Sequence, residues 1–321
     1  MSKLNITSGH IARHTPKGAG SQGREAAVID IAQDLLLNHL QDEGILGSFA
    51  IKGGTALRKL YAGKEGRFSL DLDFAIAPID EDRDALVGGF VDAVDGLQLG
   101  PFRYGVRERR GKWSVTLESP FVAESSLATK LDFSAPPWLA PETRAWAPMP
   151  IHAQYGFELP SIKTVRLEEN VAEKIARLNR TTTARDMYDL AWIARTVSVW
   201  STLDLQLIRR LALLKSWVDA NGLRSAYASW APGHEAFPFD AERWLRLRTE
   251  KEFDMQDIGA LAVPAPTAAG LSEAIRAGYA FLADMDEDEQ TLACINGRDR
   301  ALAIKMLEEL PGGRLAGVGL Y

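Results

Sequence analysis

Residues 51–75 read IKGGTALRKLYAGKEGRFSLDLDFA, and this stretch decides the fold of the chain. It begins with an apolar segment that runs into a glycine pair, and Thr55 then opens a segment with helical spacing of its apolar residues. After a basic loop, SLDLDFAI alternates large apolar residues with small or acidic ones, as is typical of a half-buried β-strand. Asp71 and Asp73 are two positions apart, so we expect both carboxylates on one side of that strand.

Regularly spaced segments on either side of this stretch predict further helices and strands. Apolar residues at helical intervals predict helices over residues 24–47 and 80–94, the second with Asp80 as its N-cap. Residues 102–108 and 113–118 are strand-like, and the RRGK sequence between them predicts a hairpin with a basic tip. The N-terminal half is therefore expected to combine a sheet with helices.

A further strand-like segment, LATKLDF at residues 127–133, carries Lys130 and Asp132 on one face. Six prolines within residues 136–160 indicate an irregular connection and a lobe boundary. Beyond it the spacing is helical over residues 167–179, 184–199, 203–220, 241–251, 271–283 and 298–310. The predicted fold class is α+β, with a mixed β-sheet lobe and flanking helices, followed by an all-helical C-terminal lobe.

The predicted organisation has three parts. Residues 1–22 lack periodicity and are expected to form a flexible N-terminal arm. Residues 23–160 are expected to form the sheet lobe, and residues 161–321 the helical lobe.

The composition, 46% hydrophobic and 25% charged, is that of an ordinary globular protein. The single cysteine, Cys294, excludes an intrachain disulfide framework and a cysteine-based zinc site. No signal-peptide pattern and no apolar run of roughly 18 residues occurs, so we expect a cytoplasmic protein with no membrane partner. A net charge of −6 argues against a protein that coats nucleic acid by bulk charge.

The spacing of the acidic residues suggests a site for hard cations. Carboxylates at positions i and i+2 of a strand lie roughly 6 to 7 Å apart at the backbone, and their oxygens can converge on Mg²⁺ or Mn²⁺. Asp132 is the candidate third metal ligand beside Asp71 and Asp73. In a two-metal site, one ion lowers the pKa of an attacking hydroxyl and the other neutralises a leaving pyrophosphate.

The turn formed by Gly53, Gly54 and Thr55 has the properties that a triphosphate site needs. Glycine has no side chain to block close approach, and backbone N–H groups at a helix start favour negative charge. Each motif also has a simpler interpretation. Glycine pairs mostly serve tight turns, the two aspartates of SLDLDF could occupy an exposed strand face, and Asp132 could pair with Lys130.

Four sequence blocks occur in order: GGTALRKLY, RFSLDLDF, KLDFS and EKIARLNRTTTARDMYDL. Together they resemble the AbiEii/AbiGii family of toxin nucleotidyltransferases, relatives of the MenT toxins within the polymerase-beta-like superfamily. The resemblance covers about residues 25–200 and implies that residues 23–160 form a nucleotidyltransferase-like catalytic lobe. It implies a nucleotide site made of Gly53, Gly54, Thr55 and Ser69. It also implies a metal site made of Asp71, Asp73 and Asp132.

The family also uses a helical lysine and an aspartate in an RDxYDL-like block, which match Lys174 and Asp186. The resemblance implies that the helical lobe contributes these two catalytic residues to the cleft, with Lys174 on the triphosphate. We interpret Asp186 as a partner that positions Lys174 or an arginine rather than as a base. The alternative is a solvated helical lysine paired with a neighbouring acid, and Arg185 and Asp189 could likewise form an ordinary helix pair.

Two clusters of basic residues are either RNA contacts or solvated surface. They are Arg103, Arg107, Arg109, Arg110 and Lys112, and Arg177, Arg180 and Arg185. The tryptophans are interpreted as packing anchors rather than base-stacking platforms, and the five histidines lack metal-ligand spacing. The acidic run at residues 284–289 is interpreted as a solvated helix end.

The resemblance implies an enzyme that transfers a nucleoside monophosphate from an NTP to an acceptor and thereby arrests growth. It implies a tRNA 3′ end as the leading acceptor and a cognate antitoxin as partner. One alternative is a catalytically inactive regulator that binds nucleotide or antitoxin, and another is an enzyme that nucleotidylates protein. A P-loop kinase is disfavoured because no G-x-x-x-x-G-K-[ST] motif occurs.

Overall fold

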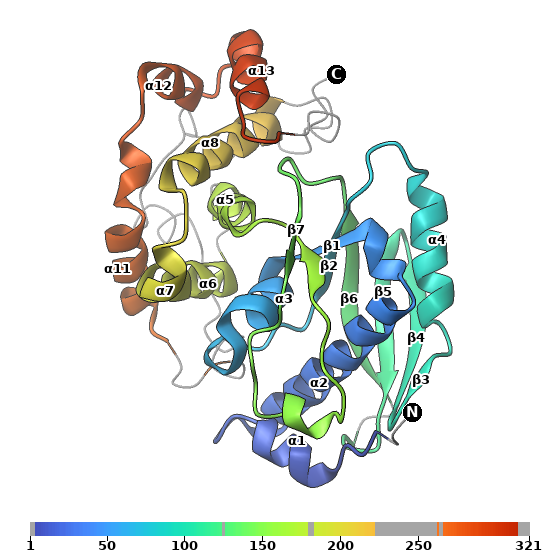
Figure 1. The fold of residues 1–321 in the computed structure, drawn as a ribbon. Helices are drawn as coiled ribbons and strands as arrows, with labels where there is room; N and C mark the ends of the chain where they lie inside the picture. The colour runs from blue at the N-terminus through green and yellow to red at the C-terminus, as the bar shows by residue number, and fades with distance from the viewer. Residues whose placement is uncertain (1–3, 124–125, 179–182, 222–261, 263–265, 314–321) are drawn as a thin grey trace. The chain divides into compact units, whose positions relative to one another are not determined.

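The computed structural model forms two compact units (Figure 1). It describes residues 4–123, 126–178, 183–221, 262 and 266–313. We call the first unit the sheet unit; it contains the described residues up to 136 and residues 141–164. We call the second the helical unit; it contains residues 137–140 and, apart from 262, the described residues from 165 onward. This is the predicted fold class, a mixed sheet with flanking helices followed by C-terminal helices.

A mixed sheet is the centre of the sheet unit, and its described strands follow the order β3-β4-β5-β6-β2-β1-β8-β7. β2 is parallel to β6 and β1 is parallel to β8, whereas the other neighbouring pairs are antiparallel. The strands are β1 (Phe49–Lys52), β2 (Leu72–Ile76), β3 (Gln98–Leu99), β4 (Phe102–Arg109), β5 (Lys112–Glu118), β6 (Leu127–Ser134), β7 (Glu142–Arg144) and β8 (Ile162–Thr164).

Two long helices pack on one face of this sheet, which we call the core face. Phe90 packs against Phe74 and Phe133, and the Tyr104 hydroxyl donates a hydrogen bond to the Ala32 carbonyl at 2.8 Å. Because apolar and polar residues alternate along the strands, the opposite face carries the charged residues; we call it the polar face. The helices of the unit are α1 (Ser8–His14), α2 (Gly20–Asp42), α3 (Gly53–Leu57), continued by a π-helical turn (Arg58–Ala62), and α4 (Arg83–Val94).

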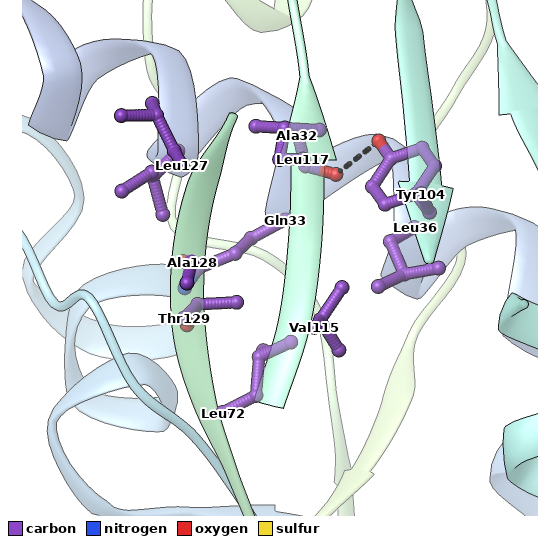
Figure 2. A pocket seen from close by; sticks show the side chains of 11 residues that line it. Ala32, Gln33, Leu36, Leu72, Tyr104, Val115, Leu117, Leu127, Ala128 and Thr129 are labelled. Atoms are coloured by element: carbon purple, nitrogen blue, oxygen red, sulfur yellow. Dashed lines mark hydrogen bonds between the residues drawn. The ribbon is translucent and has the colours of Figure 1, made fainter. Parts of the chain in front are cut away.

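A small cavity lies between α2 and the core face of the sheet (Figure 2). Its lining is mostly apolar and includes Leu36, Leu72 and Val115, together with the side chain of Gln33. Gln33 is 2% exposed, and among the described residues neither atom of its amide group has a hydrogen-bond partner. The cavity is therefore on the other side of the sheet from the Asp73 side chain and is separate from the predicted site.

The helical unit is built from α5 (Leu167–Leu178), α6 (Ala184–Arg195), α7 (Val197–Trp200), α8 (Leu205–Asn221), α11 (Ala268–Gly278), α12 (Glu287–Ala293) and α13 (Arg300–Glu308). Within it α5 packs against α8, and α6 packs against α11. Glu169 fixes residues 137–140 to this unit because its carboxylate accepts hydrogen bonds from the amides of Trp138 at 2.8 Å and Leu139 at 2.9 Å. Lys215 of α8 donates to the same carboxylate at 2.9 Å.

Several element ends differ from the sequence-based expectations. Composition predicted a flexible arm over residues 1–22, but α1 forms there because Ile11 is buried and His14 contacts Asp30 at 2.7 Å. Asp82 caps α4 in place of Asp80, because its side chain accepts from the amide two residues later.

Three further expectations concern helices in the C-terminal half of the chain. The helix predicted over residues 184–199 is interrupted at Thr196, which adopts an extended backbone. The acidic run contains the N-cap of α12, Asp286, so it begins a helix, and Glu289 within it is buried. The helix predicted over residues 241–251 lies outside the described residues. Among the described helices, none combines the length and the apolar composition that crossing a membrane requires.

Candidate active site

The two aspartates of SLDLDF lie at the start of β2. Asp73 is the second residue of the strand and Asp71 directly precedes the strand, which therefore begins three residues later than predicted. Both aspartates are half-buried while Leu72 between them is buried, so the predicted alternation is confirmed. The strand register places Asp73 beside Asp132 of β6 on one side and beside Lys52 of β1 on the other.

Negative charge is concentrated around Asp73. Burial raises the pKa of the Asp73 carboxyl, and the neighbouring carboxylates of Asp71 and Asp132 raise it further. Lys52 and Lys130 act in the opposite direction without cancelling these effects. Because the three carboxylates repel one another, a bound cation would stabilise their charged form. Carboxylate oxygens are also ligands that suit a divalent metal ion such as Mg²⁺.

The glycine turn lies directly against Asp73. Gly53 has a φ of +70°, which L side chains rarely adopt, and a Cβ atom there would stand 2.6 Å from Asp73 Oδ2. A Cβ atom on Gly54 would stand 2.8 Å from Arg67 Nη2 and 2.9 Å from Ser69 Oγ. Both positions therefore require glycine, because the turn approaches the aspartate strand and its preceding loop too closely for a side chain.

Hydroxyl groups attach the aspartate segment to its neighbours. The Thr55 hydroxyl donates to the carbonyl of Asp71, and the Thr129 hydroxyl on β6 donates to the carbonyl of Leu70. Thr55 is fully buried, so its side chain joins the glycine turn to the aspartate segment instead of presenting a free hydroxyl at the surface. Ser69, the other hydroxyl residue of the predicted nucleotide site, is 5% exposed and lies against Gly54.

Arg67 is a residue of this region that sequence reasoning missed. Its side chain is buried against Gly54, and its guanidinium donates to the carbonyl of Phe68 at 3.0 Å. The preceding loop is held by Arg58, which donates to the carbonyls of Gly63 and Gly66 at 2.6 Å each. The signal was present in the block RFSLDLDF, where an arginine stands two residues before the serine.

A buried ionic network anchors the helical segment that follows the glycine turn. Lys59 is fully buried, and its ammonium group lies 2.5 Å from Asp30 Oδ1 and 2.6 Å from Asp34 Oδ1. Burial opposes the charge of Asp30, but Arg58, Lys59 and His14 hold the pKa of its carboxyl well below the ordinary value. The sequence signal was a pair of acids four residues apart inside the apolar run VIDIAQDLLL.

Asp132 is present beside Asp73 but is turned to a different partner. Its carboxylate forms an ion pair with Lys130, two residues earlier on the same strand, as the simpler interpretation proposed. Within the described part of the chain, no three His, Cys, Asp or Glu side chains are arranged so that they could hold a metal ion. Coordination of one metal ion by all three aspartates therefore requires side-chain positions other than those of this structure.

Lys174 occupies a buried acidic setting in the helical unit. Its ammonium group lies 2.9 Å from Asp186 Oδ1 and 2.9 Å from Asp189 Oδ2. Burial opposes the charge of Asp186, but Lys174 and Arg177, with a hydrogen bond from Thr183, hold the pKa of Asp186 well below the ordinary value. The predicted contact between Asp186 and Lys174 is therefore confirmed, and a solvated helical lysine is excluded.

Comparisons with known proteins identify the family of the chain. The family model described as the nucleotidyl transferase AbiEii toxin of type IV toxin–antitoxin systems matches residues 35–294. The chain belongs to the AbiEii family. Members of this family are nucleotidyltransferases, so the protein is a nucleotidyltransferase toxin of a type IV toxin–antitoxin system.

A solved structure extends the AbiEii likeness to nearly the whole chain. MenT4, a nucleotidyltransferase toxin from Mycobacterium tuberculosis H37Rv, is 34% identical in sequence and superposes with a TM-score of 0.78. The match covers 95% of this chain and 99% of MenT4. No curated protein sequence matches the chain.

Proposed function

We propose that this AbiEii protein transfers a nucleoside monophosphate from an NTP to the 3′ end of an RNA, with tRNA as the acceptor. In this reaction the acceptor hydroxyl loses its proton to the solvent and its oxygen bonds to the α-phosphorus, while the bond from that phosphorus to the β-phosphate oxygen breaks to release pyrophosphate. The observation that carries the proposal is the contact between the glycine turn and Asp73, with Asp71 and Asp132 beside it.

We assign Asp71, Asp73 and Asp132 as the residues that hold Mg²⁺ or Mn²⁺. The raised pKa of Asp73, caused by burial and by the other two carboxylates, supports this assignment. Bound there, the metal would supply activation of the attacking hydroxyl and neutralisation of the pyrophosphate. Lys130 forms an ion pair with Asp132, so metal binding has to compete with that ion pair.

The chain's own residues position the triphosphate in this proposal. Gly53 and Gly54 let the turn lie directly against Asp73 and Ser69, so a nucleotide held at the aspartates would meet the backbone of the turn and the Ser69 hydroxyl. The Thr55 hydroxyl holds the turn against the backbone of Asp71. These residues therefore orient the nucleotide by backbone and short side chains.

We assign Lys174 as a cation that neutralises triphosphate charge in the same reaction. Its support is the family resemblance together with its burial between Asp186 and Asp189, whose two contacts restrict the position of the ammonium group. Asp186 is then a positioning residue, since its carboxylate is engaged by Lys174, Arg177 and Thr183. We propose further that residues 161–321 contribute Lys174 and Asp186 to the reaction, as the resemblance implies.

The protein acts in a toxin–antitoxin system, so we propose a cognate antitoxin as its protein partner and the cytoplasm as its location. The competing acceptor is a protein, since the same transfer chemistry can nucleotidylate a side-chain hydroxyl. An inactive regulator is a weaker alternative, because Asp71, Asp73 and Asp132 are all retained.

The test is incubation of the purified protein with Mg²⁺ and each α-labelled NTP in turn, in the presence of total RNA or of total protein. We expect label in RNA of tRNA size and loss of that label in Asp71→Asn and Asp73→Asn. Asp80→Asn, which removes one exposed carboxylate of the same unit, is the matched control and should keep the activity. Label that persists in both site variants contradicts the site, and label found in protein contradicts the RNA acceptor.

A further inference from the structure

The strand register brings a row of basic side chains together on the polar face of the sheet. Arg107 of β4 is paired with Ser114 of β5, which in turn is paired with Lys130 of β6. Arg109 of β4 is paired with Lys112 of β5. Directly paired residues project their side chains on the same side of a sheet, so these cations share one face.

That face is also the face of the aspartates. Lys130 and Asp132 are two residues apart on β6 and therefore point the same way, and Asp132 is the register neighbour of Asp73 on β2. β2 and β4 are separated by β6 and β5 in the strand order. Neighbouring strands lie about 4.8 Å apart, so three spacings place Arg109 about 14 Å from Asp73 along the sheet.

Three cations at the hairpin have no ion-pair partner within the described part of the chain. Arg107, Arg109 and Lys112 are exposed, and none of them forms an ion pair with another described residue. Two nearby acids have other partners: Glu108 and Asp95 each accept a hydrogen bond from a hairpin backbone amide. Arg109 directly opposite Lys112 is a like-charge pair, which destabilises the pairing of two strands.

The other residues of this face distinguish between possible occupants. Between the cations and along the same strands stand Gly105, Ser114, Thr116 and Ala128, which are small and give no large apolar contact. The buried centre of a protein–protein interface is aromatic or aliphatic and depleted in lysine. Phosphate groups of a nucleic acid, by contrast, are bound by arginine and lysine without apolar anchors.

We infer that Arg107, Arg109 and Lys112 bind the backbone phosphates of an RNA strand whose 3′ end lies at Asp73. This inference rests on the proposed RNA acceptor and adds the direction from which the strand approaches, across β5 and β6 from the β4–β5 hairpin. Lys130 is not one of these phosphate-binding cations, because it forms an ion pair with Asp132.

The test uses the full-length protein without NTP and measures anisotropy of a fluorescent RNA hairpin with a single-stranded 3′ tail, between 50 and 200 mM salt. The variant is the triple Arg107→Glu, Arg109→Glu, Lys112→Glu. The control triple is Arg13→Glu, Lys17→Glu, Arg298→Glu, three exposed cations on other elements with the same change in net charge. Each phosphate contact of a single strand adds about 0.7 to the slope of log affinity against log salt.

Loss of three contacts should therefore reduce that slope by about 2. Raising the salt concentration across this range should then weaken RNA binding by the hairpin variant about 20-fold less than it weakens RNA binding by wild type. The control triple should keep the wild-type slope. An unchanged slope in the hairpin variant, while wild type binds RNA, overturns this surface but leaves the proposed function intact. If wild type binds no RNA, the proposed acceptor fails together with the surface. Binding of polyglutamate that depends on the same three residues assigns the surface to an acidic protein and overturns the RNA inference.

Discussion

Alanine at position 53 tests whether the glycine turn and Asp73 work as one site. The new Cβ atom would lie 2.6 Å from Asp73 Oδ2, whereas an ordinary contact begins at 3.4 Å, so the two must separate by about 0.8 Å. Misplacement of a catalytic group by about 1 Å can reduce a rate about 100-fold, equivalent to about 2.7 kcal/mol. The φ of +70° adds a folding cost of about 1 to 2 kcal/mol for alanine.

The control for this prediction is Gly44→Ala. Gly44 has a φ of +77°, and a Cβ atom there would meet nothing within 4 Å, so the backbone cost is matched without a contact at the site. The assay is label transfer from an α-labelled NTP to RNA, with the folded fraction of each variant measured by urea titration. We expect both variants to lose similar stability and only Gly53→Ala to lose about 100-fold in rate. A rate within about threefold of the Gly44→Ala rate would refute the reasoning.

Three further predictions concern buried polar groups. Gln33→Leu removes an amide that has no partner among the described residues, so we expect urea titration to show about 1 to 2 kcal/mol more stability; a loss of stability contradicts this. Lys174→Met removes the cation that buried Asp186 and Asp189 share, although Asp186 keeps Arg177, and should cost about 3 to 5 kcal/mol. Adding Asp186→Asn and Asp189→Asn should restore much of that stability without restoring transfer, whereas restored transfer removes Lys174 from the mechanism. Burial opposes the charge of Lys215, but Glu169 and Glu173 favour that charge and raise the pKa of its ammonium group in the folded protein. The stabilising contribution of Lys215 is therefore present below the unfolded pKa of about 10.4 and disappears as the pH rises through the folded pKa. The free energy of unfolding of Lys215→Met should therefore lack this decrease at alkaline pH. Parallel curves of unfolding free energy against pH for the two proteins above pH 10 would contradict that.

The elements that carry the site followed from local patterns in the sequence. Alternation in SLDLDFAI gave the orientation of Asp71 and Asp73, and alternation in LATKLDF put Lys130 and Asp132 on one face, because strand side chains have a strict period of two. Their adjacency is a non-local property. It comes from the parallel pairing of β2 with β6, which no periodicity within either strand specifies.

Several contacts could not be predicted from the spacing of residues along the sequence. The Thr55 hydroxyl was expected at the nucleotide, but its burial and its bond to the Asp71 carbonyl depend on how tightly α3 packs on the segment before β2. The Lys59 network required the distant α2 to supply Asp30 and Asp34. Helix propensity and hydrophobic spacing describe each segment alone, and these ion pairs form between segments.

In the proposed reaction, the carboxylates at the start of β2, held against the glycine turn, catalyse nucleotidyl transfer to RNA. Mass spectrometry of a purified tRNA, after incubation with the protein, Mg²⁺ and a single NTP, measures this directly. We expect a tRNA heavier by whole nucleoside monophosphates at its 3′ end, with no mass gain when Asp73→Asn replaces the wild-type protein. An unchanged tRNA mass with wild type, or the same mass gain with Asp73→Asn, would contradict it.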